Sequence, residues 1–177
     1  MRILVAITGA SGIIYGSRLV EALRASKQDA SVIISNGAKD VAKAEGARLP
    51  KADYAESDFS APFASGSSAA DVMIVCPCSL KTLGEIANGV GSSLITRAAE
   101  VALKERKKLV LVVRETPYSL ITIKNMERVT LAGTVVLPAS PGFYHKPRTV
   151  SDMVDFVVGK TLDSAGIQNK LFKRWGK

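Results

Sequence analysis

Small, hydroxylated and charged residues gather at four points of the chain, each directly after a run of apolar residues. Gly9-Ala10-Ser11-Gly12 and Ser35-Asn36-Gly37 follow the first two runs, and Cys76-Pro77-Cys78-Ser79 and Arg114-Glu115-Thr116-Pro117 follow the next two. Backbone N–H groups and hydroxyls bind phosphate where a helix begins, arginine binds phosphate through paired hydrogen bonds, and glutamate can transfer a proton. The four segments therefore predict a site for a phosphorylated ligand.

The glycine-containing turn at residues 9–12 allows two interpretations. It has the parts of a phosphate-binding turn, but a plain strand-to-helix turn capped by Ser11 would have the same residues. The complete G-x-G-x-x-G pattern is absent, and no acidic residue closes the second apolar run to bind a ribose. This disfavours NAD and is compatible with FMN. Ser79 and Thr82 place two hydroxyls on the first turn of a later helix, which favours a second phosphate-binding helix end.

Three further sets of charged residues each have a functional and a structural interpretation. Arg97 and Lys104 are seven residues apart and share a helix face, but Glu100 lies between them, as in a solvent-exposed ladder of ion pairs. Lys160 lies in the apolar arc of its helix, where it either extends to solvent or points into an anionic site. His145 is the only histidine, and without an acidic residue to orient it, a structural or surface role stays open.

Apolar runs alternate with segments of helical periodicity. We expect strands at residues 3–8, 30–35, 71–76, 108–113 and 134–137, and helices at 15–25, 38–46, 79–87, 94–106, 118–131 and 150–166. Residues 47–69 read as a long irregular connection, and Thr116-Pro117 predicts an N-cap followed by proline at the first helical position. The alternation predicts an α/β fold with a doubly wound parallel sheet, in which ligands bind at the carboxyl ends of the strands.

The composition of the whole chain excludes several classes of protein. No apolar run reaches the ~18 residues of a membrane span, and the apolar N-terminus is too short for a secretory signal, so the cytoplasm is the expected location. Cys76 and Cys78, one proline apart, suggest buried reduced thiols rather than disulfides, and a metal site is not expected. The net charge is +8, but the basic residues are dispersed, so a nucleic-acid-binding protein is only a distant alternative.

Read together, several segments resemble one family over nearly the whole chain. They are Ile7-Thr8-Gly9-Ala10-Ser11-Gly12 with Tyr15-Gly16, Ser65-Gly66-Ser67, Cys76-Pro77-Cys78-Ser79, residues 97–105, Val113-Arg114-Glu115-Thr116-Pro117, residues 141–147 and Arg174-Trp175. This combination is similar to the flavin prenyltransferases, the UbiX-like proteins once described as aromatic-acid decarboxylases. Residues 47–62 carry little of the resemblance, and Asn36-Gly37 stands where relatives more often have Lys-Ala.

The resemblance implies a Rossmann- or flavodoxin-like three-layer sandwich and a single FMN-binding domain over residues 1–177. It also implies a homo-oligomer, typically a dodecamer, with the site at subunit junctions and a tail at about 167–177 that packs on a neighbouring subunit. The implied reaction joins a dimethylallyl group from dimethylallyl phosphate to N5 and C6 of reduced FMN without a metal. The prenylated FMN would serve a UbiD-like decarboxylase. Related FMN-dependent decarboxylases of cysteine-containing substrates are the alternative, although their catalytic histidine is not evident here.

Matching positions also imply the roles of individual residues. The expected FMN-binding residues are Gly9, Ala10, Ser11, Ser35, Ser79, Leu80, Lys81, Thr82 and Arg114. The expected residues for dimethylallyl phosphate are Tyr144, Lys160, Arg97, Lys104, Arg114 and Trp175, with Phe63 as a second aromatic wall beside Trp175. The expected catalytic residues are Ser11, Glu45, Glu115, Lys104 and Arg97, the two glutamates serving in proton transfer.

Overall fold

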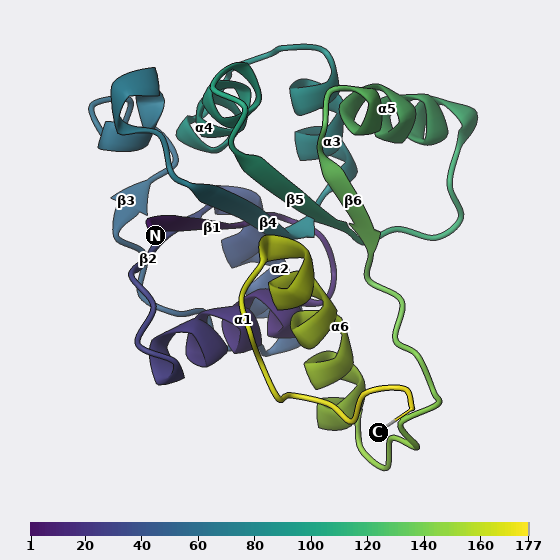
Figure 1. Ribbon diagram of the computed structural model, residues 1–177. Coiled ribbons are helices and arrows are strands. Elements are labelled where there is room, and N and C mark those ends of the chain that lie inside the picture. The colour runs from purple at the N-terminus through teal and green to yellow at the C-terminus, as the bar shows by residue number, and fades with distance from the viewer. Residues whose placement is uncertain (177) are drawn as a thin grey trace.

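A single parallel sheet of six strands forms the centre of the molecule (Figure 1). The structure is a computed structural model and describes residues 1–176. The strand order is β3-β2-β1-β4-β5-β6. The strands are β1 (Ile3–Ile7), β2 (Ala30–Ile34), β3 (Tyr54–Ala55), β4 (Val72–Cys78), β5 (Lys108–Val113) and β6 (Val135–Pro138). Every residue of β1 and β4 is buried, as expected for strands covered on both faces.

Helices cover both faces of the sheet, which confirms the predicted three-layer sandwich (Figure 1). One layer contains α1 (Ile13–Ala25), α2 (Asn36–Glu45) and α6 (Val150–Ala165). The other contains α3 (Leu80–Ala87), α4 (Leu94–Lys104) and α5 (Leu120–Leu131). The chain proceeds from β1 to β2 and β3 on one side, and from β4 to β5 and β6 on the other. The connections therefore change direction between β1 and β4, the place where such sheets bind ligands.

The carboxyl ends of β1 and β4 are joined by a buried threonine. The Thr8 hydroxyl donates to the carbonyl of Pro77 at 2.8 Å and accepts the backbone N–H of Ser79 at 2.8 Å. Helix α1 lies so close to β4 that a Cβ on Gly16 would clash with the Cys76 carbonyl oxygen. These contacts fix the turn after β1 and the start of α3 relative to each other.

The connection from β5 to β6 differs from the prediction. Helix α5 begins at Leu120, and its N-cap is Ser119, whose hydroxyl accepts the Thr122 N–H at 3.2 Å. Thr116-Pro117 therefore does not start the helix; the proline follows a cis peptide bond in the preceding loop. The prediction was wrong because Ser119, three residues further along the chain, provides the capping hydroxyl.

Two other segments are more ordered than the sequence suggested. Strand β4 continues through Pro77 to Cys78, so the two cysteines lie within the strand. Both thiols are buried, and burial raises the pKa of each, that of Cys78 to about 12. Residues 47–69 contain β3 and two 3₁₀ turns, Pro62–Ala64 and Gly66–Ser68. Within residues 1–176, no helix combines the length and apolar character needed to span a membrane.

Candidate active site

The ends of four strands meet around one polar cavity of about 440 Å³. Gly9 follows β1, Ser35 follows β2, the segment Ser79–Thr82 follows β4, and Glu115 lies just beyond β5. The crevice that the sequence predicted at this edge of the sheet is therefore present. It contains seven of the expected site residues: Gly9, Ser35, Ser79, Leu80, Lys81, Thr82 and Glu115.

Two helix N-termini point towards this cavity. At the start of α2, the Ser35 hydroxyl accepts the N–H of Ala38 at 3.0 Å. At the start of α3, the Ser79 hydroxyl accepts the N–H of Thr82 at 3.3 Å and lies 3.1 Å from the Thr82 hydroxyl. Each serine is thus an N-cap, while other first-turn N–H groups and the positive ends of two helix dipoles remain near the cavity. This arrangement suits a phosphate.

A close contact between two glycines shapes one wall of the cavity. A Cβ on Gly9 would lie 2.9 Å from the carbonyl carbon of Gly37, closer than backbone atoms can tolerate. The reverse contact is ordinary, because a Cβ on Gly37 would lie 3.6 Å from the Gly9 Cα. Glycine is therefore needed at position 9, whereas the alanine expected at position 37 from the resemblance would also fit.

The N-terminus of α1 is already occupied by a carboxylate of the protein. Gly12 is the N-cap, with φ of 96° and no capping side chain. Glu45, at the end of α2, accepts the N–H of Gly12 at 2.7 Å and that of Ile13 at 3.1 Å. Burial raises the pKa of Glu45, but hydrogen bonds from Ser11, Gly12 and Ile13 and the charge of Arg114 outweigh it, so the pKa is lowered. Ser11 is therefore not the cap of α1.

Arg114 lies near the same edge as Tyr15, to which the sequence analysis gave no role, and Glu56, which it did not name. Arg114 is half-buried, and its charge acts on both Glu45 and Tyr15. Burial, and then Cys76, raise the pKa of Tyr15 more than Arg114 lowers it. Glu56 lines the cavity and accepts the Asn36 N–H at 2.8 Å. No pattern in the sequence marked Glu56, because the strand before it has only two residues.

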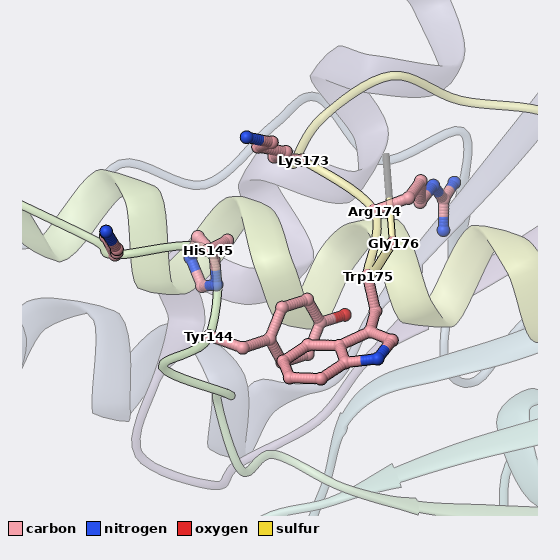
Figure 2. A pocket seen from close by; sticks show the side chains of 7 residues that line it. Tyr144, His145, Lys173, Arg174, Trp175 and Gly176 are labelled. Carbon is pink, nitrogen blue, oxygen red and sulfur yellow. The ribbon is translucent and has the colours of Figure 1, made fainter.

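Tyr144 and Trp175 line a second cavity of about 550 Å³ (Figure 2). Their rings meet edge to face, with centroids 5.3 Å apart. His145 stacks on Phe156 at 5.1 Å, and neither of its buried ring nitrogens has a hydrogen-bond partner in the part of the chain described. This fits the structural interpretation of the histidine. Lys160 is exposed on α6, as in the solvent-directed interpretation.

The remaining expected residues lie elsewhere in the single chain. Arg97 donates to the Ala64 carbonyl at 3.2 Å and forms an ion pair with Glu100 at 2.9 Å. The Arg97–Glu100 pair of the ladder interpretation is therefore present. Lys104 instead pairs with Glu105. Glu45 also lines a third cavity of about 600 Å³ between α1, the end of α2 and the start of α6. Ala10 is buried, and Phe63 is buried beside Tyr54. One chain thus provides several separate parts of the expected site.

No group of three or more histidine, cysteine, aspartate or glutamate residues in the described chain is arranged to hold a metal ion. The polar groups at the edge of the sheet are instead backbone N–H groups, hydroxyls, Arg114 and carboxylates. Such a donor set fits the phosphate and hydroxyl groups of a nucleotide or flavin, which need anion-binding N–H groups and hydrogen-bonding partners.

Comparison with known proteins identifies the relatives of this chain. Residues 1–162 match the flavoprotein family. The chain is 48% identical to the flavin prenyltransferase UbiX of Thermoplasma acidophilum, over 99% of this chain and 100% of that protein. The crystal structure of AnUbiX in complex with FMN and dimethylallyl pyrophosphate superposes with a TM-score of 0.94, at 42% identity, covering 99% of this chain and 97% of AnUbiX.

A dodecameric FMN-dependent UbiX-like decarboxylase from Escherichia coli superposes equally well, with a TM-score of 0.94 and 38% identity over the whole of both chains. Identity at this level, sustained over the full length, is accompanied by the same fold. The chain therefore belongs to the UbiX-type flavin prenyltransferases of the flavoprotein family.

Proposed function

We propose that this protein is a flavin prenyltransferase, which joins the dimethylallyl group of dimethylallyl phosphate to N5 and C6 of reduced FMN. The observation that carries the proposal is the convergence of the α2 and α3 N-termini and the Gly9 turn on one cavity, in a chain nearly half identical to known flavin prenyltransferases. Two helix N-termini provide for one phosphate group, and the strand ends beside them can accommodate the rest of a flavin mononucleotide.

FMN is assigned to the cavity at the strand ends. Ser35, Ser79 and Thr82 would hold its phosphate together with the N–H groups of the first turns of α2 and α3. The turn at Gly9, Ala10 and Ser11 would lie against the rest of the flavin, because it forms the adjoining wall. Leu80, Lys81 and Arg114 complete the expected set, with Arg114 placed towards Tyr15 and Glu45.

The protein's own residues can assist departure of the phosphate from the dimethylallyl donor. Breaking the allylic C–O bond gives a phosphate, which leaves as the dianion when it carries one proton, and a prenyl group with cationic character. Arginine, lysine and hydroxyl donors stabilise the first, and the faces of Tyr144 and Trp175 can stabilise the second. Glu115 accepts an N–H from Thr116 at 2.9 Å and borders the cavity, which supports the proposal that it takes up a proton.

A second copy of the chain would complete the proposed site. Arg97 and Lys104 lie on α4 and contact residues 64–66 and Glu105, whereas Gly9 and Ser79 line the cavity at the strand ends. We propose that a neighbouring subunit contributes Arg97 and Lys104, and that Lys160 joins the donor phosphate at the same junction. A homo-oligomer, such as the dodecamer formed by the Escherichia coli relative, would supply this arrangement.

The proposed product is prenylated FMN for a UbiD-like decarboxylase in the cytoplasm. The test is to incubate the protein anaerobically with reduced FMN and dimethylallyl monophosphate, and to add the mixture to a UbiD-type apo-decarboxylase. We expect decarboxylation only when protein, FMN and donor are all present. The Thermoplasma acidophilum relative, assayed in the same way, is the positive control. Failure to activate the decarboxylase while that relative succeeds would contradict the proposal.

The alternative of an FMN-dependent decarboxylase acting on a cysteine-containing substrate has less support. His145, the only histidine, packs among aromatic rings next to Tyr144 and does not line the cavity at the strand ends. Release of carbon dioxide from a cysteine-terminated peptide or pantothenoylcysteine by the FMN-loaded protein would favour this alternative.

A further inference from the structure

The segment 167–176 folds back along α6 and carries Trp175 to the loop that contains Tyr144. We call this segment the C-terminal strap; in Figure 2 it brings Trp175 beside Tyr144, whereas the Arg174 side chain points away from His145. Two buried apolar residues anchor the strap: Ile167 is 7% exposed, and Phe172 is 9% exposed and packs on Phe156 at 4.8 Å. Trp175, by contrast, is 79% exposed. Its position therefore depends on its neighbours in the strap more than on its own burial.

Asp163, near the end of α6, holds the strap through several hydrogen bonds. Its carboxylate pairs with both outer nitrogens of the Arg174 guanidinium, with 2.8 Å between Nη2 and Oδ1. The same Oδ1 accepts the Asn169 amide at 2.9 Å. Arg174 also donates to the Asn169 carbonyl at 3.1 Å and lies over the Phe172 ring at 4.4 Å. Two-pronged Arg–carboxylate pairs fix direction as well as distance.

The fixed arginine directly precedes Trp175. Because the guanidinium of Arg174 is held on Asp163, the indole ring of Trp175 can reach only a limited area. It contacts the Tyr144 ring edge to face, with 5.3 Å between the ring centroids and 88° between the ring planes. Tyr144 in turn packs edge to face on Phe156 at 5.6 Å. The chain of contacts therefore runs from Asp163 through Arg174 to the two aromatic side chains assigned to the prenyl group.

We propose that Asp163 is a positioning residue of the reaction, which holds the strap so that Trp175 and Tyr144 together form the wall for the dimethylallyl chain. The inference rests on the proposed function for the role of that wall, but the position of the strap can be measured without any reaction. Asp163 touches neither substrate in this assignment and acts only through Arg174 and Asn169.

Trp175 is the only tryptophan, so its fluorescence reports directly on the strap. We expect Asp163→Asn in the full-length protein to lower the fluorescence anisotropy of Trp175, because the indole gains local motion. The matched control is Asp155→Asn on the same helix. Asp155 pairs with Arg18 at 2.6 Å with similar exposure, yet it joins α6 to α1 and does not contact the strap. Unchanged anisotropy in Asp163→Asn, or an equal loss in the control, would overturn the inference.

The enzymatic consequence separates this inference from the proposed function. In Asp163→Asn we expect the KM for dimethylallyl monophosphate to rise about threefold to tenfold through the smaller population of the ordered strap, with FMN affinity unchanged. The charge-exchanged variant Asp163→Arg with Arg174→Asp should recover both the anisotropy and the KM. Prenylation with an unaltered KM in Asp163→Asn refutes the positioning role, whereas absence of prenylation in the wild type refutes the proposed function and leaves the anisotropy test intact.

Discussion

Glu45 provides the most direct test of how the turn after β1 is held. Its carboxylate bridges the first two free N–H groups of α1, at 2.7 and 3.1 Å, from the far end of α2. Gly12 cannot serve as a side-chain cap, so no other group in the described chain takes these bonds. Glu45→Gln keeps an acceptor and removes the charge, whereas Glu45→Ala removes both.

The expected loss of stability follows from capping energies. Loss of an N-terminal cap costs about 1 kcal/mol, and the charge contributes ~0.3–1 kcal/mol through the helix dipole at an exposed position. We therefore expect Glu45→Ala to lose about 1–2 kcal/mol and Glu45→Gln about half as much. For a chain of this size, each kcal/mol lowers Tm by roughly 2–4 °C. Asp40→Asn is the control, because Asp40 is exposed on the same helix and its side chain forms no hydrogen bond or ion pair in the described chain.

The pH dependence of this effect has a defined sign. The pKa of Glu45 is lower in the folded protein than its ordinary value of 4.5, so its ionised form stabilises the fold. This stabilisation is fully present when the pH is above the ordinary pKa of a glutamate, and it is lost as the pH falls through the lowered pKa of the folded protein. Thermal melts of wild type and Glu45→Gln should therefore differ at pH 7 and converge in acid. A difference that is absent at pH 7, or that grows in acid, would refute the capping role.

Other predictions concern the cavity itself. Gly9→Ala should weaken FMN binding by at least about tenfold, ~1.4 kcal/mol, because the new Cβ would collide with the Gly37 backbone. Gly37→Ala is the control and should bind FMN normally. Equal losses of affinity for the two variants in an FMN titration would contradict this asymmetry. Thr82→Val should weaken FMN binding by about fivefold to tenfold through loss of one hydroxyl, while Thr122→Val, in the equivalent Ser-x-x-Thr pair of α5, should not. Glu115→Gln should bind both substrates but stall, and wild-type turnover in a single-turnover assay would exclude its role in proton transfer.

Residues next to strong local patterns were predictable from the sequence. The apolar runs of β1, β2, β4 and β5 located four strand ends, and parallel strands bring such ends to one edge, so Gly9, Ser35, Ser79 and Glu115 lie around one cavity. N-cap residues were also predictable where a hydroxyl-bearing residue directly precedes a helix, as Ser79 precedes α3. These features depend on local chemistry and on a rule of topology.

Features that depend on contacts between distant segments were not predictable in the same way. Glu45 takes the cap position that one of the two interpretations of the turn gave to Ser11, because the end of α2 returns to the start of α1. Glu56 follows a strand of only two residues, too short to produce a periodic pattern. Arg97 and Lys104 share a helix face as expected, but in the single chain they pair with Glu100 and Glu105 and do not line the cavity. The first two require the folded chain, and the junction that we propose for Arg97 and Lys104 would require a second subunit.

The central claim is tested most directly by the mass of the flavin. The purified protein is incubated anaerobically with dithionite-reduced FMN and dimethylallyl monophosphate, and the flavin is extracted and examined by mass spectrometry. The account predicts FMN heavier by one five-carbon isoprenyl unit, formed only when protein and donor are both present. Bound FMN of unchanged mass, with the Thermoplasma acidophilum relative active under the same conditions, would contradict it.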